Sequence, residues 1–284
     1  MDFSYYPGCS LHSTAAEYDD SLRAVASALG VGLHELEDWN CCGASSAHGV
    51  NRALSLALPA RNLALAQQSD RDLVMPCAAC FNQHKTADHT LRTNDSQRAV
   101  IEHAVDFEFT GAVAVRSLLD VFANEIGLAQ VEARVKRPLA GLKVVGYYGC
   151  LLVRPPEVTQ FENPEHPTLM NQLLSTLGAD ARPWSYATDC CGGGVSLIKP
   201  DMAARLVNRL AGRAREAGAE AMVTSCPLCQ VNLEMRQTGA EPPLPIFYFT
   251  ELMGLAFDLI EAQSWWPKHL IDPRGLLQKF GLYR

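Results

Sequence analysis

The chain has 284 residues, of which 48% are hydrophobic and 19% are charged. This composition excludes disorder as the main state, and the length allows one large domain or two small ones. The net charge is −7 and no basic tract stands out, so the sequence argues against nucleic acid as a partner. We find no leader-like N-terminus and no run near the ~18 apolar residues of a membrane span. We therefore expect a soluble, cytoplasmic chain with reduced cysteines and no transmembrane segment.

The first half of the chain opens with a predicted strand at residues 3–6, which ends just before Cys9. A helix is expected next, because Thr14 and Glu17 have the spacing of a capping box and Gly30 is placed to end the helix. The remaining predicted elements are a weaker strand at 33–36, a helix at 51–68 with a kink or restart at Pro59, and a strand at 73–75.

The second half repeats this order. A predicted strand at residues 144–148 ends just before Cys150, and Thr168 can cap a helix that Gly178 ends. The remaining predicted elements are a weaker strand at 183–186, a helix from Asp201 to a stop at Gly218, and a strand at 222–224. Strands that alternate with helices predict an α/β fold, with a small parallel sheet flanked by helices in each of two tandem homologous halves.

The cysteines carry the clearest evidence of this duplication. In both halves a Cys-Cys-Gly is followed, 34 residues later, by a Cys-x-x-Cys. Other segments also correspond, namely residues 5–9 with 147–150 and residues 107–110 with 247–250. A Pro- and Gly-containing stretch at 136–141 suggests the boundary, so we predict a first domain at 1–138 and a second at 139–284.

Each group of cysteines follows a predicted strand. Ligands bind at the carboxyl ends of strands in open α/β sheets, so the five thiols of a half are expected to converge. Thiolates suit zinc, cuprous copper and iron–sulfur clusters, but structural zinc or a cubane cluster takes only four. Adjacent cysteines could instead bridge neighbouring irons of a more open cluster, and Gly43 and residues 192–194 would leave that cluster accessible.

With these features, the sequence resembles the B subunit of heterodisulfide reductase over essentially the whole chain. The resemblance includes both Cys-Cys-Gly modules and the segments 136–144, 147–156 and 271–274. It implies two non-cubane [4Fe-4S] clusters, the first on Cys9, Cys41, Cys42, Cys77 and Cys80, the second on Cys150, Cys190, Cys191, Cys226 and Cys229.

The resemblance also implies a function. Proteins of this kind reduce a disulfide, or oxidise thiols in reverse, between two one-electron centres. Electrons would pass through two partners, a ferredoxin-like C subunit and a flavin-containing A subunit. His48 is a candidate proton donor to the product thiolate, and His12 is a second one, although a surface histidine is the commoner case.

Two other functions remain open at this point. The chain could be an electron-transfer or membrane-docking subunit of a respiratory complex, or a zinc-stabilised assembly module. Three further features also have two interpretations. The tyrosines at 5, 6, 147 and 148 are strand packing or pocket lining, and Arg154 binds an anion or forms a surface ion pair. Trp265 and Trp266 anchor a partner or pack in the core.

Overall fold

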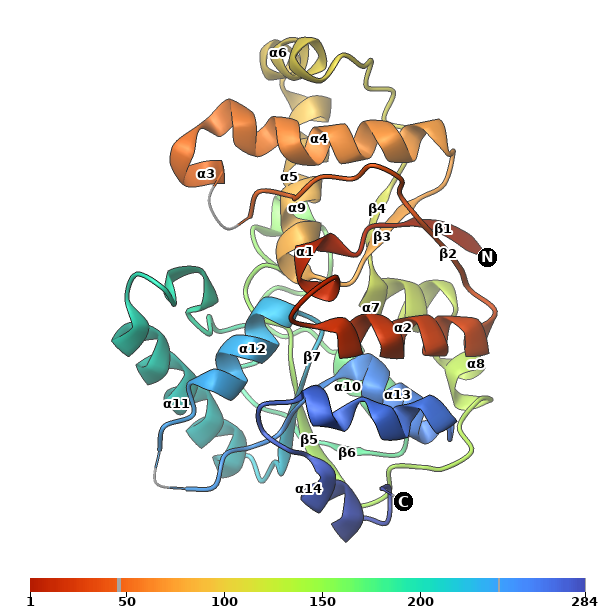
Figure 1. The fold of residues 1–284 in the computed structure, drawn as a ribbon, viewed down its shortest axis with the longest axis vertical. Helices are drawn as coiled ribbons and strands as arrows, with labels where there is room; N and C mark the ends of the chain where they lie inside the picture. Colours follow the sequence, from red (N-terminus) through yellow and green to blue (C-terminus); the bar gives the residue numbers. More distant parts are fainter. Residues whose placement is uncertain (45–46, 240, 284) are drawn as a thin grey trace.

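The structure is a computed structural model that describes residues 1–44, 47–239 and 241–283. Two four-stranded parallel sheets form its framework, one in each half of the chain (Figure 1). The strand orders are β2-β1-β3-β4 and β6-β5-β7-β8, so the second sheet repeats the topology of the first. The predicted α/β fold with duplicated halves is confirmed.

The first sheet joins β1 (Asp2–Tyr5), β2 (Gly32–Glu35), β3 (Leu73–Met75) and β4 (Val115–Ser117). Tyr5 pairs with Val74, and Leu73 pairs with Val115. The helical elements of this half are α1 (Gly8–Leu11), α2 (Ala16–Leu29), α3 (Ala47–Val50), α4 (Arg52–Gln68), α5 (Ala78–Thr93), α6 (Asp95–Val105), α7 (Leu118–Asp120), η1 (Val121–Glu125) and α8 (Leu128–Glu132).

The second sheet joins β5 (Lys143–Tyr147), β6 (Asp180–Ala181), β7 (Ala221–Thr224) and β8 (Ile246–Tyr248). Tyr147 pairs with Thr224, which pairs with Tyr248. The helical elements are α9 (Pro156–Thr159), α10 (Leu169–Thr176), η2 (Gly193–Val195), α11 (Pro200–Glu216), α12 (Pro227–Met235), α13 (Phe249–Ala256), η3 (Ile260–Ser264), η4 (Trp266–Lys268) and α14 (Arg274–Lys279).

Several local predictions need correction. Helix α2 does end at Gly30, which is left-handed at φ +72°, but its N-cap is Ala15 and no side chain caps it. The reason is that the carbonyl of Ser10 accepts bonds from Ser13 and Ala15, so a turn leads directly from α1 into α2. Helix α4 runs through the buried Pro59 without a restart. Strand β6 lies at residues 180–181 rather than 183–186.

The fourth strand of each sheet shows that one predicted correspondence is wrong. Residues 107–110 form no strand, and the counterpart of β8 is β4, so Phe247 corresponds to Arg116, nine residues after the matched Phe107. Strand β4 is only three residues long and has Arg116 at its centre, so its sequence lacks the apolar run that identifies β3.

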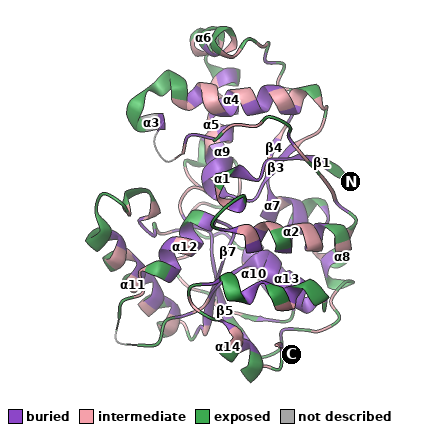
Figure 2. Cartoon of the chain, viewed as in Figure 1, coloured by how far each residue is buried: buried purple, intermediate pink, exposed green. Residues whose placement is uncertain are grey.

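The halves pack against each other through helices (Figure 1). Helix α2 of the first half lies against α13 of the second, and α10 of the second lies against α7 and η1 of the first. Ser21 and Thr250 form a buried hydrogen bond of 2.7 Å in the α2–α13 contact. The two sheets and the helices between them contribute to one continuous buried core, which Figure 2 shows in purple.

The C-terminal segment completes this core. Trp265 and Trp266 are each 1% exposed, and Trp266 packs edge-on against Phe247 of β8. The core interpretation of the two tryptophans is therefore right, and neither side chain is free to anchor a partner. In the part of the chain that the structure describes, no helix is both long enough and apolar enough to cross a membrane.

Candidate functional site

The cysteines follow the strands in the same way in both halves. Cys9 lies in α1, directly after β1, and Cys77 is the N-cap residue of α5, directly after β3. Cys150 follows β5, and Cys226 is the N-cap residue of α12, after β7. All ten cysteines are free thiols. Because the strands are parallel, these positions lie at the same edge of each sheet.

Sulfur atoms from different cysteine groups meet in each half. Cys42 Sγ lies 3.3 Å from Cys80 Sγ, and the equivalent pair, Cys191 and Cys229, lies 3.6 Å apart. The hydrogen bond with Cys42 raises the pKa of Cys41, and the hydrogen bond with Cys190 raises the pKa of Cys150. Thiols that lie far apart in the sequence are thus brought into direct contact.

The two sets present the same gradient of exposure. In the first half Cys9 and Cys41 are exposed, and in the second Cys190 is exposed and Cys150 is half-buried. The other six thiols are buried. Each set therefore has a solvent-facing side and a side that faces the core, as an accessible centre requires.

Glycines let the backbone approach the buried sulfurs. Gly8 and Gly149 precede the first cysteine of each set and have φ values of +73° and +68°. A Cβ at either position would lie 3.1 Å from a sulfur, that of Cys80 in the first half and that of Cys229 in the second. A side chain would push the sulfur aside. Both positions therefore favour glycine for two reasons, the left-handed φ and the lack of room for a Cβ.

A tyrosine hydroxyl holds each Cys-Cys-Gly loop. Tyr6 donates to the carbonyl of Asn40 at 2.9 Å, and Tyr147 donates to that of Asp189 at 2.6 Å. Each acceptor residue directly precedes its cysteine pair. Burial raises the pKa of both tyrosines, and the nearby cysteines raise it further, so both hydroxyls keep their protons. The four tyrosines at 5, 6, 147 and 148 are fully buried, and Tyr6 and Tyr147 both pack in the core and support the site.

The halves differ beside the thiols. In the first half His84 is fully buried, its Nδ1 donates to the carbonyl of Cys80 at 2.8 Å, and its Nε2 accepts from Asn62. Burial lowers the pKa of His84, so the ring is neutral. The equivalent position in the second half, four residues after Cys229, is the apolar Leu233. Sequence reasoning missed His84, although its place one turn after the Cys-x-x-Cys could have indicated it.

The two sets of cysteines meet at the boundary between the halves. The thiols of Cys77 and Cys226 interact, which raises the pKa of Cys77, while hydrogen bonds with Cys229 and with Cys77 lower the pKa of Cys226. Asn82, two residues after Cys80, donates to the carbonyls of Leu151 and Arg154 at 2.9 and 2.7 Å. The cysteine helix of the first half is thus bound to the loop after Cys150 in the second.

Two other predicted residues, His12 and Arg154, lie at the periphery. His12 Nε2 is 3.0 Å from Glu35, and about half of its side chain is exposed. Arg154 forms an ion pair with Glu165 at 2.8 Å and donates to the carbonyl of Thr188, which favours the ion-pair interpretation. His48 belongs to α3, but its side chain lies outside the described part of the chain.

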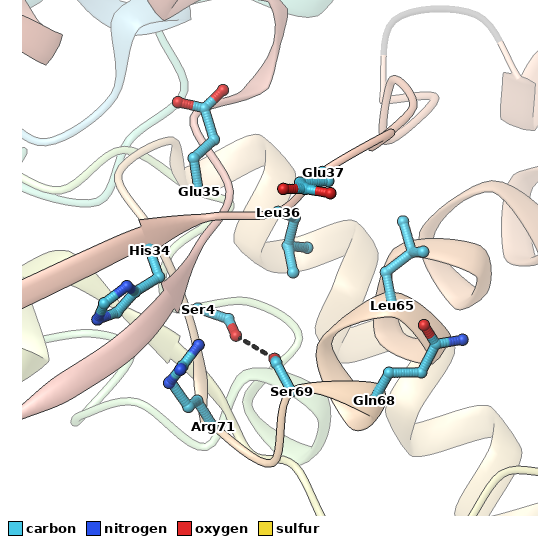
Figure 3. A pocket seen from close by; sticks show the side chains of 9 residues that line it. All are labelled: Ser4, His34, Glu35, Leu36, Glu37, Leu65, Gln68, Ser69 and Arg71. Atoms are coloured by element: carbon cyan, nitrogen blue, oxygen red, sulfur yellow. Dashed lines mark hydrogen bonds between the residues drawn. The ribbon is translucent and has the colours of Figure 1, made fainter.

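A cavity of about 490 Å³ lies elsewhere, beside the end of β2 (Figure 3). Two of its lining residues, Ser4 and Ser69, form a hydrogen bond of 2.7 Å. None of the ten cysteines lines it, so we assign it no part in the site. The lining residues are Ser4, His34, Glu35, Leu36, Glu37, Leu65, Gln68, Ser69 and Arg71.

The donor set fits a thiolate-bound centre in each half. Five free thiols per half, with adjacent sulfurs in contact and glycines that clear space for them, offer soft ligands for iron or another thiophilic metal. Among the described residues no group of three or more His, Cys, Asp or Glu side chains is arranged to hold a single metal ion.

Comparison with known proteins assigns both repeats to one domain family. The family model described as "Cysteine-rich domain" matches twice, at residues 3–85 and 144–234. The chain is 32% identical over 282 residues to the 8-methylmenaquinol:fumarate reductase membrane anchor subunit of Wolinella succinogenes, with 97% of this chain and 99% of that protein covered.

Two further comparisons extend this result. The chain is 24% identical to the B subunit of the ferredoxin/F420H2-dependent CoB-CoM heterodisulfide reductase of Methanosarcina acetivorans, with 89% of this chain and 88% of that protein covered. Among solved structures, a hypothetical protein from Helicobacter pylori matches with a TM-score of 0.72 at 10% identity. That match covers 95% of this chain and 52% of the other, and it supports the fold alone.

Proposed function

Because the chain belongs to the cysteine-rich domain family, we propose that it is the catalytic subunit of a heterodisulfide reductase-like complex. In this proposal two units, residues 1–138 and 139–284, each bind one non-cubane [4Fe-4S] cluster. The ligands are Cys9, Cys41, Cys42, Cys77 and Cys80 in the first unit, and Cys150, Cys190, Cys191, Cys226 and Cys229 in the second. The free state of all ten thiols supports a reducing, cytoplasmic location.

The observation that carries the proposal is the convergence of the two sets, because the hydroxyl of Tyr18 lies 3.3 Å from the carbonyl of Pro76, just before Cys77, and 3.1 Å from that of Ser225, just before Cys226. Cleavage of a disulfide consumes two electrons and two protons and yields two thiols. When bound, iron–sulfur clusters supply single electrons and sites where sulfur can bind iron. Two sets in contact suit a reaction in which one substrate meets both centres.

The chain's own residues position and support this site. The exposed Cys9, Cys41 and Cys190 mark the side from which a substrate can approach. Tyr6 and Tyr147 hold the Cys-Cys-Gly loops at the carbonyls that precede them. Electrons would come from a ferredoxin-like partner and a flavin-containing partner, and the relative that is named as one subunit of a reductase supports such an assembly.

Metal analysis after anaerobic purification tests the proposal. We expect about four irons per five-cysteine set, and Cys9→Ser should remove iron from the first set only. Bound zinc without iron would instead favour an assembly module. Turnover of disulfides with a reduced viologen dye is the second step, and intact clusters that release no thiol product would refute catalysis.

A second candidate function is docking of a respiratory complex to a membrane. Leu197 and Ile198, in the loop between the Cys190–Cys191 pair and α11, are 93% and 81% exposed. Consecutive large aliphatic side chains that protrude this far suit insertion into a lipid surface. The relative named as a membrane anchor subunit supports the same function.

Vesicle sedimentation separates the two candidates. If the loop docks, the chain should sediment with vesicles of mixed neutral and anionic lipid, and the double substitution Leu197→Ser and Ile198→Ser should abolish this. Ile260→Ser is the matched control, because Ile260 is 76% exposed but lies in η3. Equal sedimentation of both variants would count against docking through this loop.

A further inference from the structure

Tyr18 lies where the two halves meet. It is the third residue of α2, and its side chain is 0% exposed. Its ring stacks on that of Tyr248, the last residue of β8, with centroids 4.0 Å apart and planes inclined by 6°. A residue of the first half is therefore embedded in the second, and the stacked ring fixes where its hydroxyl points.

The hydroxyl of Tyr18 lies between two equivalent carbonyls. It is 3.3 Å from the carbonyl of Pro76 and 3.1 Å from that of Ser225. These residues directly precede Cys77 and Cys226, the first cysteines of the two Cys-x-x-Cys groups. One hydroxyl has one hydrogen, so the two halves share a single donor at this point.

The surroundings keep that donor in place. Burial raises the pKa of Tyr18 well above its ordinary value, and Cys226 and Cys77 raise it further, so the hydroxyl stays protonated. The hydroxyl of Tyr248 is 3.4 Å from Gln230, the residue after Cys229. The stacked pair therefore contacts Pro76, just before helix α5, Ser225, just before helix α12, and Gln230 within α12.

We propose that Tyr18 is a positioning residue, whose hydroxyl bonds to Pro76 and Ser225 fix the separation of the two cysteine centres and so the electronic coupling between them. This inference rests on the proposed function, since it assumes a redox centre in each half. The carbonyls belong to Pro76 and Ser225, which directly precede Cys77 and Cys226, so loss of either bond shifts one of these two cysteines relative to the other. A buried aromatic ring alone would fill the same space without this link.

The test compares Tyr18→Phe with Tyr5→Phe in the full chain, purified anaerobically. Tyr5 is the matched control, because it is also 0% exposed and loses a hydroxyl bond, at 2.6 Å to Asp19 rather than to the cysteine segments. Iron and sulfide are measured first. Absence of iron from the wild-type chain would refute the proposed function itself, independently of Tyr18.

With iron present, we measure the electron paramagnetic resonance spectrum of the fully reduced protein and the midpoint potentials of the two centres. Tyr18→Phe should weaken the magnetic interaction between the centres and change the gap between their potentials, whereas Tyr5→Phe should leave both as in the wild type. Spectra and potentials of Tyr18→Phe that match those of the wild type would overturn the proposal.

A second measurement needs no cluster. In the metal-free chain, a short bifunctional thiol reagent should link Cys77 to Cys226, and mass spectrometry of the digested product identifies the linked peptides. We expect the yield of this link to fall at least threefold in Tyr18→Phe and to stay unchanged in Tyr5→Phe. An unchanged yield in Tyr18→Phe, or no link in the wild type, would also overturn the proposal.

Discussion

Replacement of Gly8 by alanine tests whether the space beside the buried sulfurs matters. At φ +73° an alanine pays about 1–2 kcal/mol for the left-handed backbone. Its Cβ would also lie 3.1 Å from Cys80 Sγ, which is itself only 3.3 Å from Cys42 Sγ and has little room to move. Overpacking of this kind adds about 1–3 kcal/mol, so we expect a total cost of about 2–5 kcal/mol.

Gly30→Ala is the matched control for backbone strain. Gly30 has nearly the same φ, +72°, but its Cβ would meet nothing within 4 Å. We expect this variant to lose only the cost of about 1–2 kcal/mol for the left-handed residue. In the second half, Gly149→Ala and Gly218→Ala form the same pair, because only Gly149 lies beside a sulfur.

The assay is iron content per chain together with thermal unfolding, under anoxic conditions. Gly8→Ala should lose iron from the first set and Gly149→Ala from the second, because metal ligation tolerates only about 0.2 Å of displacement. Both controls should keep their iron and melt a few degrees lower. If Gly8→Ala retains as much iron as Gly30→Ala, the sulfur contact has no role in the site and our reasoning fails.

Three other outcomes follow from the structure. Burial raises the pKa of Glu17 from 4.5 to about 7, so stability should fall as pH rises from about 4.5 to 7, by roughly 3 kcal/mol, and Glu17→Gln should remove this dependence in melts across that range. Tyr6→Phe removes a bond worth about 0.5–1.5 kcal/mol from the first Cys-Cys-Gly loop, so a chelator should extract iron faster; an unchanged rate would contradict this. Gly254→Ala should destabilise by about 1–3 kcal/mol because its Cβ would lie 2.5 Å from Trp265, whereas Gly275→Ala, in an uncrowded helix, should stabilise slightly; equal melting temperatures would refute the packing argument.

The cysteine pattern predicted where the thiols lie, and their role as cluster ligands stays a prediction. The strands before the two Cys-x-x-Cys groups could be recognised because they are short apolar runs, and parallel strands deliver their ends to one edge. The contacts that connect the halves were not predictable. Tyr18 reaches carbonyls 58 and 207 residues away, and nothing in its local sequence distinguishes it from an ordinary core tyrosine.

Prediction of the fold from the sequence was limited in a similar way. The repeat itself predicted two sheets, but β4 has too few apolar residues to be recognised without its pairing to β3. The helix starts were also misplaced where backbone turns, rather than side chains, determine the first residue, as at Ala15. Long-range pairing and packing supplied what local propensity lacked.

In each half, a helix packs against helices of the other half, and this arrangement suggests how the chain arose. Since α2 covers α13 while α10 covers α7 and η1, a single ancestral module would have left an apolar face bare. Two identical copies could have covered that face mutually, as a symmetric homodimer does. Fusion of the copies removes the requirement for symmetry, so one copy can keep a histidine beside its thiols while the other has a leucine at the same place. If each half binds its proposed cluster, selection can then give the two clusters unequal affinities for electrons, which a true homodimer would not allow.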